Sequence, residues 1–308
     1  MSAKGTLIVI GGPTASGKTR AAAALAGHFG TEVISADSRQ FYRDMCIGTA
    51  RPLEDELQGV PHHFLGHLAI HEAWSAGAFA RAAEPVLQDL ITRHGSAVLV
   101  GGSGLYMDAA LKGLDPLPAG DPRVRTRLQE RWEREGLAPL LTELQDRDPA
   151  TWQRIDRNNP HRVIRALEVC LLSGRTYSEQ RHAPQDRNDM RIVRIALELP
   201  RNELYRRIED RVDAMVAAGL VQEARALLPH RHHNALRTVG YRELFAHFDG
   251  EITLEEAVAL IKQHTRNYAK RQLTWLRREP GWRFVHPEDV AGMFRLVDAG
   301  QGPHPGHT

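Results

Sequence analysis

Residues 12–19 read Gly-Pro-Thr-Ala-Ser-Gly-Lys-Thr, which has the G-x-x-x-x-G-K-[ST] spacing of a phosphate-binding P-loop. Its glycines let backbone N–H groups turn toward phosphate oxygens, Lys18 is expected to reach the terminal phosphate, and Thr19 is expected to place a hydroxyl on Mg²⁺. The predicted phosphate-binding residues are Gly12, Pro13, Thr14, Ala15, Ser16, Gly17, Lys18 and Thr19. The alternative is a chance glycine turn, and the motif leaves open which reaction follows.

Two further polar residues come directly after apolar runs. Asp37 follows residues 32–36, and Ser103 lies in the glycine turn that follows residues 97–100. These runs, like the one before the P-loop, are typical of buried parallel strands. Because ligands bind beyond the carboxyl ends of such strands, we expect Asp37 and Ser103 to face the same crevice as Lys18. Asp37 can then bind Mg²⁺ or act as a general base, although a helix N-cap or a plain loop carboxylate is the simpler interpretation.

The elements that must position these residues are indicated by composition and period. Residues 20–29 and 74–93 are predicted helices, and residues 192–197 a returning core strand. A further helix is predicted over 204–228. It carries Arg211, which can reach the phosphate site, although an isolated Arg on a helix is more often a surface residue. His62 and His63 are adjacent in a predicted loop and are interpreted as non-ligands.

Two segments carry concentrated positive charge. Residues 123–181 have helical periodicity, and within them His161 and Arg165 share one face, which is either an anion-binding face or a solvated one. On the predicted helix 257–282, basic residues form one stripe with aromatic residues interleaved, and such a stripe is typical of RNA-binding surfaces. The members of the stripe are Lys262, Arg266, Tyr268, Lys270, Trp275, Arg277 and Trp282.

Composition bounds the class of protein. The chain has 308 residues, of which 42% are hydrophobic and 25% charged, as in ordinary globular proteins. Its two cysteines are far apart, so neither a disulfide framework nor a zinc site is implied. No apolar stretch reaches membrane-spanning length, and the first strand begins too early to leave room for a signal peptide, so we expect a cytoplasmic protein that does not contact a membrane.

The expected fold is α/β: a P-loop, nucleotide-kinase-like parallel sheet with helices on both faces and a helical insertion domain. The first part of the core is assigned to residues 1–115 and the helical insertion to residues 116–190. Residues 191–298 are expected to complete the core and to supply C-terminal basic helices, and residues 299–308 are expected to form a disordered tail.

The ordered set of motifs resembles the bacterial tRNA dimethylallyltransferase family, also called isopentenyl-tRNA transferases. The resemblance covers roughly residues 6–284 and is highly specific as a set, although each motif except the P-loop is weak alone. The matching segments are 12–19, 37–43, 47–52, 59–63, 101–106, 159–169, 239–241 and 270–276.

The resemblance implies transfer of a dimethylallyl group from its diphosphate to the exocyclic amine of the adenosine 3′-adjacent to the anticodon, in tRNAs that read codons beginning with U. The P-loop would hold the diphosphate, with Mg²⁺ at Thr19. Asp37 would be the general base, Ser103 a hydrogen-bonding group where the family usually has Thr, and Arg211 a diphosphate contact. The chain is expected to be a monomer.

The resemblance also implies a set of contacts to the tRNA anticodon stem-loop. His161 departs from the Gln expected at its position, and Ala50-Arg51 from a commoner Ala-Lys. The implied tRNA contacts are Asp37, Ser38, Arg39, Gln40, Ser103, His161, Arg162, Val163, Ile164, Arg165, Lys270, Arg271, Gln272, Leu273, Thr274, Trp275, Leu276 and Arg277.

Two different classes of protein share part of these features. A small-molecule P-loop kinase would also place an Asp after its second strand and would use ATP, but it has no use for the basic aromatic helix. A P-loop RNA-binding regulator without covalent chemistry leaves the Asp37 and Ser103 segments unexplained.

Overall fold

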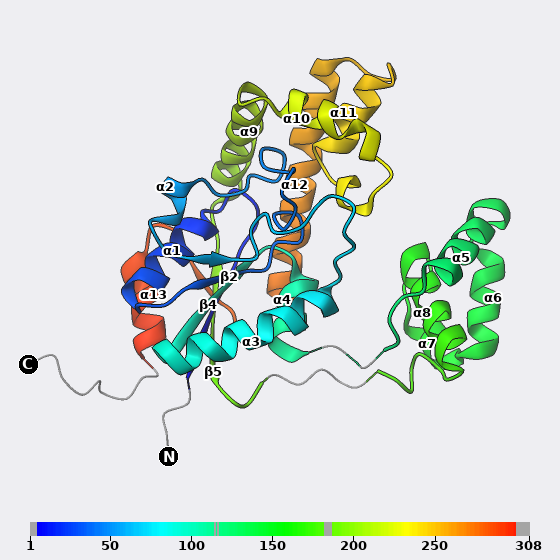
Figure 1. Cartoon of the computed structure of the whole chain (residues 1–308), viewed down its shortest axis with the longest axis horizontal. Helices are drawn as coiled ribbons and strands as arrows, with labels where there is room; N and C mark the ends of the chain where they lie inside the picture. The colour runs from blue at the N-terminus through cyan, green and yellow to red at the C-terminus, as the bar shows by residue number, and fades with distance from the viewer. Residues whose placement is uncertain (1–4, 114, 116, 182–186, 300–308) are drawn as a thin grey trace, which may run out of the picture. The chain divides into compact units, whose positions relative to one another are not determined.

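The computed structural model describes residues 5–113, 115, 117–181 and 187–299, and these divide into two compact units (Figure 1). The first unit comprises the chain up to Leu111 together with the chain from Arg187 onward, and the second spans Lys112–Asp186. The predicted tail, residues 299–308, lies outside the described residues except for Ala299. No helix in the described ranges is both long and apolar enough to cross a bilayer.

The first unit is built on one parallel sheet with the strand order β3-β2-β4-β1-β5-β6. The central strands are rich in buried β-branched and leucine residues, because helices cover both faces of the sheet. This confirms the predicted fold class. The strands are β1 (Thr6–Gly11), β2 (Val33–Ser35), β3 (His62–His63), β4 (Ser96–Gly101), β5 (Arg191–Leu197) and β6 (Arg283–Val285). The two edge strands β3 and β6 were not predicted from the sequence, because none of their residues is buried and no apolar run marks them.

One face of the sheet is covered by α1 and α13, whose apolar side chains pack on Ile8, Ile10 and Ile195. On the other face, α3 and α4 pack against Leu7, Val9 and Leu99 (Figure 1). The helices are α1 (Lys18–His28), α2 (Glu54–Leu57), α3 (Ala76–His94), α4 (Gly104–Lys112) and α13 (Val290–Asp298).

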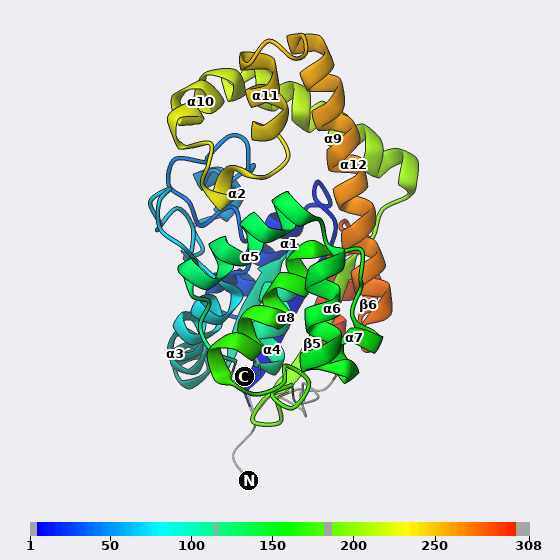
Figure 2. The same cartoon turned by 90° about the vertical axis from the view of Figure 1, so that its right-hand side faces the viewer.

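The helices between β5 and β6 lie beyond the carboxyl edge of the sheet (Figure 2). The single helix predicted over 204–228 is wrong: the structure has two helices, because Gly219 between them adopts a left-handed φ of 105°. These helices are α9 (Arg201–Ala217), α10 (Leu220–Leu227), α11 (Tyr241–Phe248) and α12 (Leu254–Arg278), with short 3₁₀ turns at Leu228–His230 and Asn234–Leu236. In Figure 2, α11 packs beside the first half of α12.

The second unit is a bundle of four helices around a core of leucine, isoleucine and valine side chains. Three of its helices begin at a proline preceded by an Asp or Asn N-cap, the pattern that favours a helix start. The helices are α5 (Pro122–Glu135), α6 (Ala138–Arg147), α7 (Pro149–Arg154) and α8 (Pro160–Ser173).

A buried carboxylate on α8 connects this helix to α5. The Glu168 side chain is fully buried and accepts hydrogen bonds from Arg125 (2.6 Å), Arg165 (2.7 Å) and the backbone N–H of Asp121 (3.1 Å). Replacement of Glu168 with Ala removes these bonds and is expected to lower the free energy of unfolding by about 2–3 kcal/mol. A thermal melt should show the loss, whereas Glu179→Ala at an exposed position should leave the melting temperature unchanged; equal melting temperatures for the two variants would contradict the prediction.

Candidate active site

The P-loop, Asp37 and Ser103 follow three neighbouring strands at one edge of the sheet. The P-loop follows β1, Asp37 follows β2, and Ser103 follows β4, and these strands are adjacent in the order β2-β4-β1. The Ser103 hydroxyl lies 3.1 Å from that of Ser38, beside Asp37. The sheet topology therefore brings these residues together at the carboxyl edge, as the sequence predicted.

A cavity of about 540 Å³ opens at this edge and is lined entirely by the first unit. Residues from the P-loop, the segment after β2, and helices α9 and α12 contribute to its walls. Among the predicted site residues, the cavity is lined by Thr14, Ala15, Gly17, Lys18, Thr19, Asp37, Ser38, Arg39, Gln40, Arg211, Arg271 and Gln272. The volume falls in the range of small-molecule sites.

The P-loop backbone has the conformation that its sequence predicts at Gly17, where φ is 84°, and a left-handed φ of 64° at Ala15 as well. Gly12, Pro13 and Ser16 are buried and do not line the cavity. The Pro13 carbonyl accepts a hydrogen bond from Lys18 Nζ at 2.8 Å. A side chain at Gly12 would collide with the Ser16 hydroxyl, which is buried and has no partner among the described residues.

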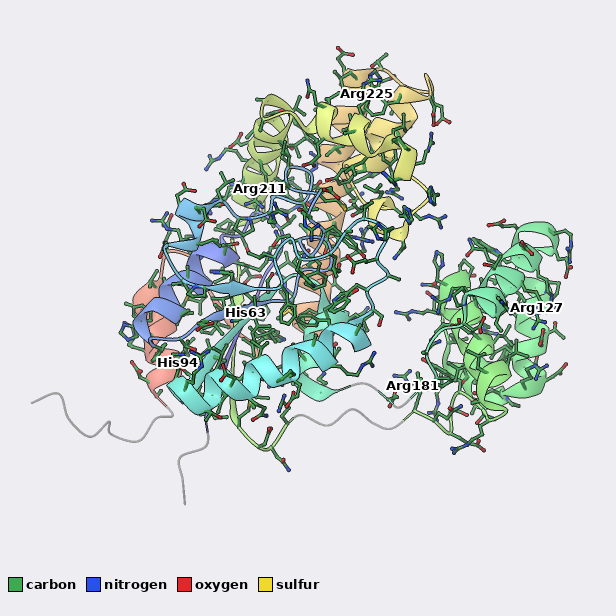
Figure 3. All side chains as sticks on the ribbon, viewed as in Figure 1. His63, His94, Arg127, Arg181, Arg211 and Arg225 are labelled. Carbon is green, nitrogen blue, oxygen red and sulfur yellow. The ribbon has the colours of Figure 1, made fainter. Side chains whose placement is uncertain are left out.

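Lys18 and Arg211 bring two positive charges into the same cavity. Burial lowers the pKa of Lys18 to about 8; the Arg211 guanidinium contributes to this decrease, and the Asp37 carboxylate opposes it. Burial also lowers the pKa of Arg211, with the Glu56 carboxylate opposing (Figure 3 marks Arg211 on α9). No carboxylate within the described ranges forms an ion pair with Arg211. Two poorly solvated cations in one cavity favour a polyanionic ligand.

Asp37 lies at the P-loop side of this cavity, and its Oδ1 accepts a hydrogen bond from the backbone N–H of Arg39 at 3.1 Å. Tyr268 on α12 lines the same space, and burial, with a further contribution from the Asp37 charge, raises the pKa of its hydroxyl to about 12. The Tyr268 hydroxyl is therefore a neutral donor at physiological pH, beside a carboxylate that can accept a proton.

Several residues predicted to bind tRNA have other roles in the structure. Val163 and Ile164 are buried in the core of the second unit, and Leu276 in that of the first. Because their side chains are removed from solvent, we correct the prediction that they contact tRNA. His161 and Arg162 on α8 are exposed, while Arg165 is half-buried and donates to the Pro118 carbonyl as well as to Glu168.

Gln272 is also a correction, because its side chain is only 5% exposed. Its amide oxygen accepts from the backbone N–H of Thr14 at 2.8 Å, and its amide nitrogen donates to the Gly102 carbonyl at 2.9 Å. Gln272 therefore connects the P-loop to the glycine turn of Ser103. No local pattern in the sequence indicates this contact, since 258 residues separate Gln272 from Thr14.

The basic stripe of α12 is partly neutralised from elsewhere in the chain. Lys262 pairs with Asp213, Arg266 with Glu209, and Arg277 with Glu198. Trp282 is buried, and Trp275 packs against it and donates to Asp108, so neither indole is an exposed stacking surface. Lys270, Arg271 and Thr274 remain exposed, and Leu273 packs in a small core cluster beside the P-loop.

The two adjacent histidines are held by local partners, and the described residues contain no cluster of three or more His, Cys, Asp or Glu side chains suited to a metal ion. His62 Nδ1 lies 2.8 Å from the Val60 carbonyl, and His63, labelled in Figure 3, lies 2.6 Å from Glu32.

The family model described as IPP transferase matches residues 40–279. The chain belongs to this family. It is 47% identical to the tRNA dimethylallyltransferase of Christiangramia forsetii, over 95% of this chain and 97% of that protein. The crystal structure of the full-length tRNA isopentenylpyrophosphate transferase from Bacillus halodurans is 35% identical and has a TM-score of 0.70, with 96% of this chain and 95% of that chain covered.

A eukaryotic dimethylallyltransferase acting on tRNA has the same fold at 23% identity, with a TM-score of 0.77 and coverage of 96% of this chain and 77% of that chain. The resemblance that the motifs indicated is thereby confirmed at the level of the IPP transferase family. The family places the chain among prenyltransferases rather than kinases, which is consistent with a P-loop cavity that also has an apolar part.

Proposed function

We propose that this IPP transferase family member transfers a dimethylallyl group from dimethylallyl diphosphate to the exocyclic amine of the adenosine 3′-adjacent to the anticodon. The tRNAs would be those that read codons beginning with U. The observation that carries the proposal is the single cavity in which Lys18 and Arg211 meet Asp37, beside the Ser38–Ser103 hydroxyl pair. A diphosphate at the cations and an amine at the carboxylate are then neighbours.

Different residues of the site are assigned to different parts of the transfer reaction. An aryl amine is a weak nucleophile, so the reaction depends on stabilising the negative charge that develops on the leaving diphosphate. Lys18, Arg211 and the P-loop amides supply that stabilisation. Asp37 accepts the amine proton as the new C–N bond forms and the C–O bond to diphosphate breaks. The Ser103 hydroxyl orients the amine beside Asp37.

Mg²⁺ fits the oxygen donors of this site. The Thr19 hydroxyl lines the cavity, and Mg²⁺ binds oxygen ligands such as this hydroxyl. With no larger acidic cluster in the described part of the chain, diphosphate and water oxygens would complete the shell. When bound, the ion would neutralise part of the diphosphate charge.

The target adenine is expected to leave its stack in order to reach this enclosed site, since the amine lies on its base-pairing edge. The half-buried Arg39 and the exposed Arg271 line the cavity, and together with the exposed Lys270 they are the proposed contacts to the anticodon stem-loop. His161 and Arg162 of the second unit are proposed as additional phosphate contacts.

The test is a transfer assay with radiolabelled dimethylallyl diphosphate, Mg²⁺ and a tRNA that carries adenosines in its anticodon loop. Label in the tRNA, mapped to the adenosine 3′ of the anticodon and unaffected by omission of ATP, supports the proposal. Unlabelled tRNA, together with ATP hydrolysis or phosphate transfer to a small molecule, would instead favour a P-loop kinase.

A double variant tests the tRNA surface. Lys270→Gln combined with Arg271→Gln removes two exposed charges and is expected to weaken tRNA binding and to reduce the slope of log Kd against log salt by about 1–2. Filter binding across a salt series measures both. Lys262→Gln is the matched control, because Lys262 on the same helix is already paired with Asp213. A slope equal to that of the wild type would mean that Lys270 and Arg271 are merely solvated.

A further inference from the structure

One wall of the cavity is formed by residues 46–52, a loop that contains no helix or strand. Gly48, Thr49, Ala50 and Pro52 line the cavity, opposite residues of α9 and α12. The loop contains the left-handed residue Ala50, with a φ of 48°, so its path depends on contacts from outside. Those contacts therefore decide the shape of the cavity at this wall.

The strongest of these contacts come from one carboxylate on α10. Glu223 Oε2 accepts hydrogen bonds from the backbone N–H groups of Cys46 at 2.9 Å and Ile47 at 2.8 Å. Its Oε1 accepts from the Gly48 N–H at 2.8 Å and from the Tyr241 hydroxyl at 2.7 Å. Both oxygens are thus used twice, and all four partners are donors.

The partners of Glu223 are themselves rigidly held. Tyr241 is fully buried, and a side chain at Gly48 would come within 2.6 Å of the Tyr241 ring, so the loop packs directly on that ring. On the opposite side, the Gln40 amide donates to the carbonyls of Thr49 at 3.2 Å and Ala50 at 3.0 Å. Hydrogen bonds to Gln40 of the segment after β2 and to Glu223 of α10 therefore hold the loop in place.

The cavity lining includes two chemically different groups of side chains. Lys18, Thr19, Asp37 and Arg211 are polar, whereas a set of aliphatic side chains supplies apolar surface. The aliphatic residues are Ile208, Val212, Met215, Leu220, Val239 and Ile261. Leu220 is the first residue of α10, the helix that carries Glu223, and Val239 precedes Gly240, the N-cap of α11. A ligand with a charged head and a short hydrocarbon chain matches this division.

We propose that Glu223 is a positioning residue that fixes the wall formed by residues 46–52, and that this wall limits the length of the allylic chain that the cavity accepts. The inference rests on the proposed function, because it takes an allylic diphosphate as the ligand. Glu223 acts through the loop and does not contact the reacting atoms. Gln cannot replace it, since the Gln amide nitrogen would face N–H and O–H donors.

The experiment measures binding by calorimetry with the full-length chain, Mg²⁺ and three ligands: inorganic diphosphate, dimethylallyl diphosphate and the ten-carbon geranyl diphosphate. Glu223→Gln is expected to weaken dimethylallyl diphosphate about tenfold while leaving inorganic diphosphate within about twofold. The affinity ratio of the ten-carbon to the five-carbon ligand should rise about tenfold. Tyr241→Phe, which removes one of four donors, should give a smaller change in the same direction.

The control variant is Gln222→Ala, at an exposed neighbouring position on α10, which should bind all three ligands as the wild type does. Equal weakening of inorganic and dimethylallyl diphosphate by Glu223→Gln, or an unchanged ratio of ten-carbon to five-carbon affinity, would overturn the proposal. Label transfer by the wild type tests the proposed function separately: a chain that binds the ligands as expected but transfers nothing to tRNA would leave the role of Glu223 standing and reject the reaction.

Discussion

Replacement of Asp37 with Asn is expected to lower kcat for dimethylallyl transfer by about 10²–10⁴-fold, the usual contribution of a general base. Asn keeps the shape of the side chain and an oxygen that can accept the hydrogen bond from the Arg39 backbone. It cannot, however, accept a proton from the attacking amine. The measurement is single-turnover transfer with saturating tRNA and dimethylallyl diphosphate.

The same variant should leave the tRNA dissociation constant within about twofold, because the phosphate contacts that dominate RNA affinity are not changed. Asp44→Asn is the matched control, since Asp44 lies on the same loop, is exposed and does not line the cavity. Wild-type turnover in the Asp37→Asn variant would remove Asp37 from the role of base.

Loss of the P-loop lysine is the second large effect. Lys18→Gln is expected to lower kcat by about 10²–10³-fold, because one preorganised charge at the leaving diphosphate is removed. In the structure Lys18 is directed to the Pro13 carbonyl, so a bound diphosphate would have to compete with a single neutral acceptor. Rapid-quench measurement of labelled tRNA at saturating substrates determines the change, and a loss smaller than threefold would contradict it.

The lowered pKa of Lys18 also predicts a pH dependence. Below about pH 8 the Lys18 ammonium is charged in the free protein and contributes fully to diphosphate affinity. Above about pH 8 the free protein loses this proton, so binding must take it up again and the contribution of Lys18 to the affinity should fall as the pH rises. Calorimetric titration with inorganic diphosphate between pH 7 and 9.5 tests this, and Lys18→Arg should abolish the fall because Arg stays charged throughout.

The P-loop, Asp37 and Ser103 were predictable because each depends on local sequence. A strand that ends in a glycine turn positions its next polar residue at the carboxyl edge of a parallel sheet, whatever the distant parts of the chain do. Buried apolar runs in and around β1, β2, β4 and β5 show this pattern. The edge strands β3 and β6 contain no buried residue, so no apolar run marks them and they were missed.

The basic stripe of α12 shows the limit of local reasoning. Only one acidic residue, Glu279, lies between Lys262 and Arg283, so the segment suggests a continuous polyanion surface. The carboxylates that pair with its cations come from α9 and from the end of β5, about 50 to 80 residues away. The charge balance on a helix face therefore depends on acidic residues of neighbouring elements. The periodicity of the helix's own sequence does not reveal these residues.

By itself, the sequence determined the phosphate-binding turn, the parallel α/β core and the helical unit through spacing and hydrophobic period, and it indicated the family through the resemblance of its ordered motifs. The tertiary structure decided which polar side chains are free to act. In the folded chain, Gln272 and Glu223 hold the loops around the cavity through hydrogen bonds. Val163 and Ile164 are buried, and Arg211 lies beside Lys18. Hydrogen bonds and burial between residues far apart in the chain depend on packing, and therefore only the folded chain distinguishes the residues that bind from those that support them.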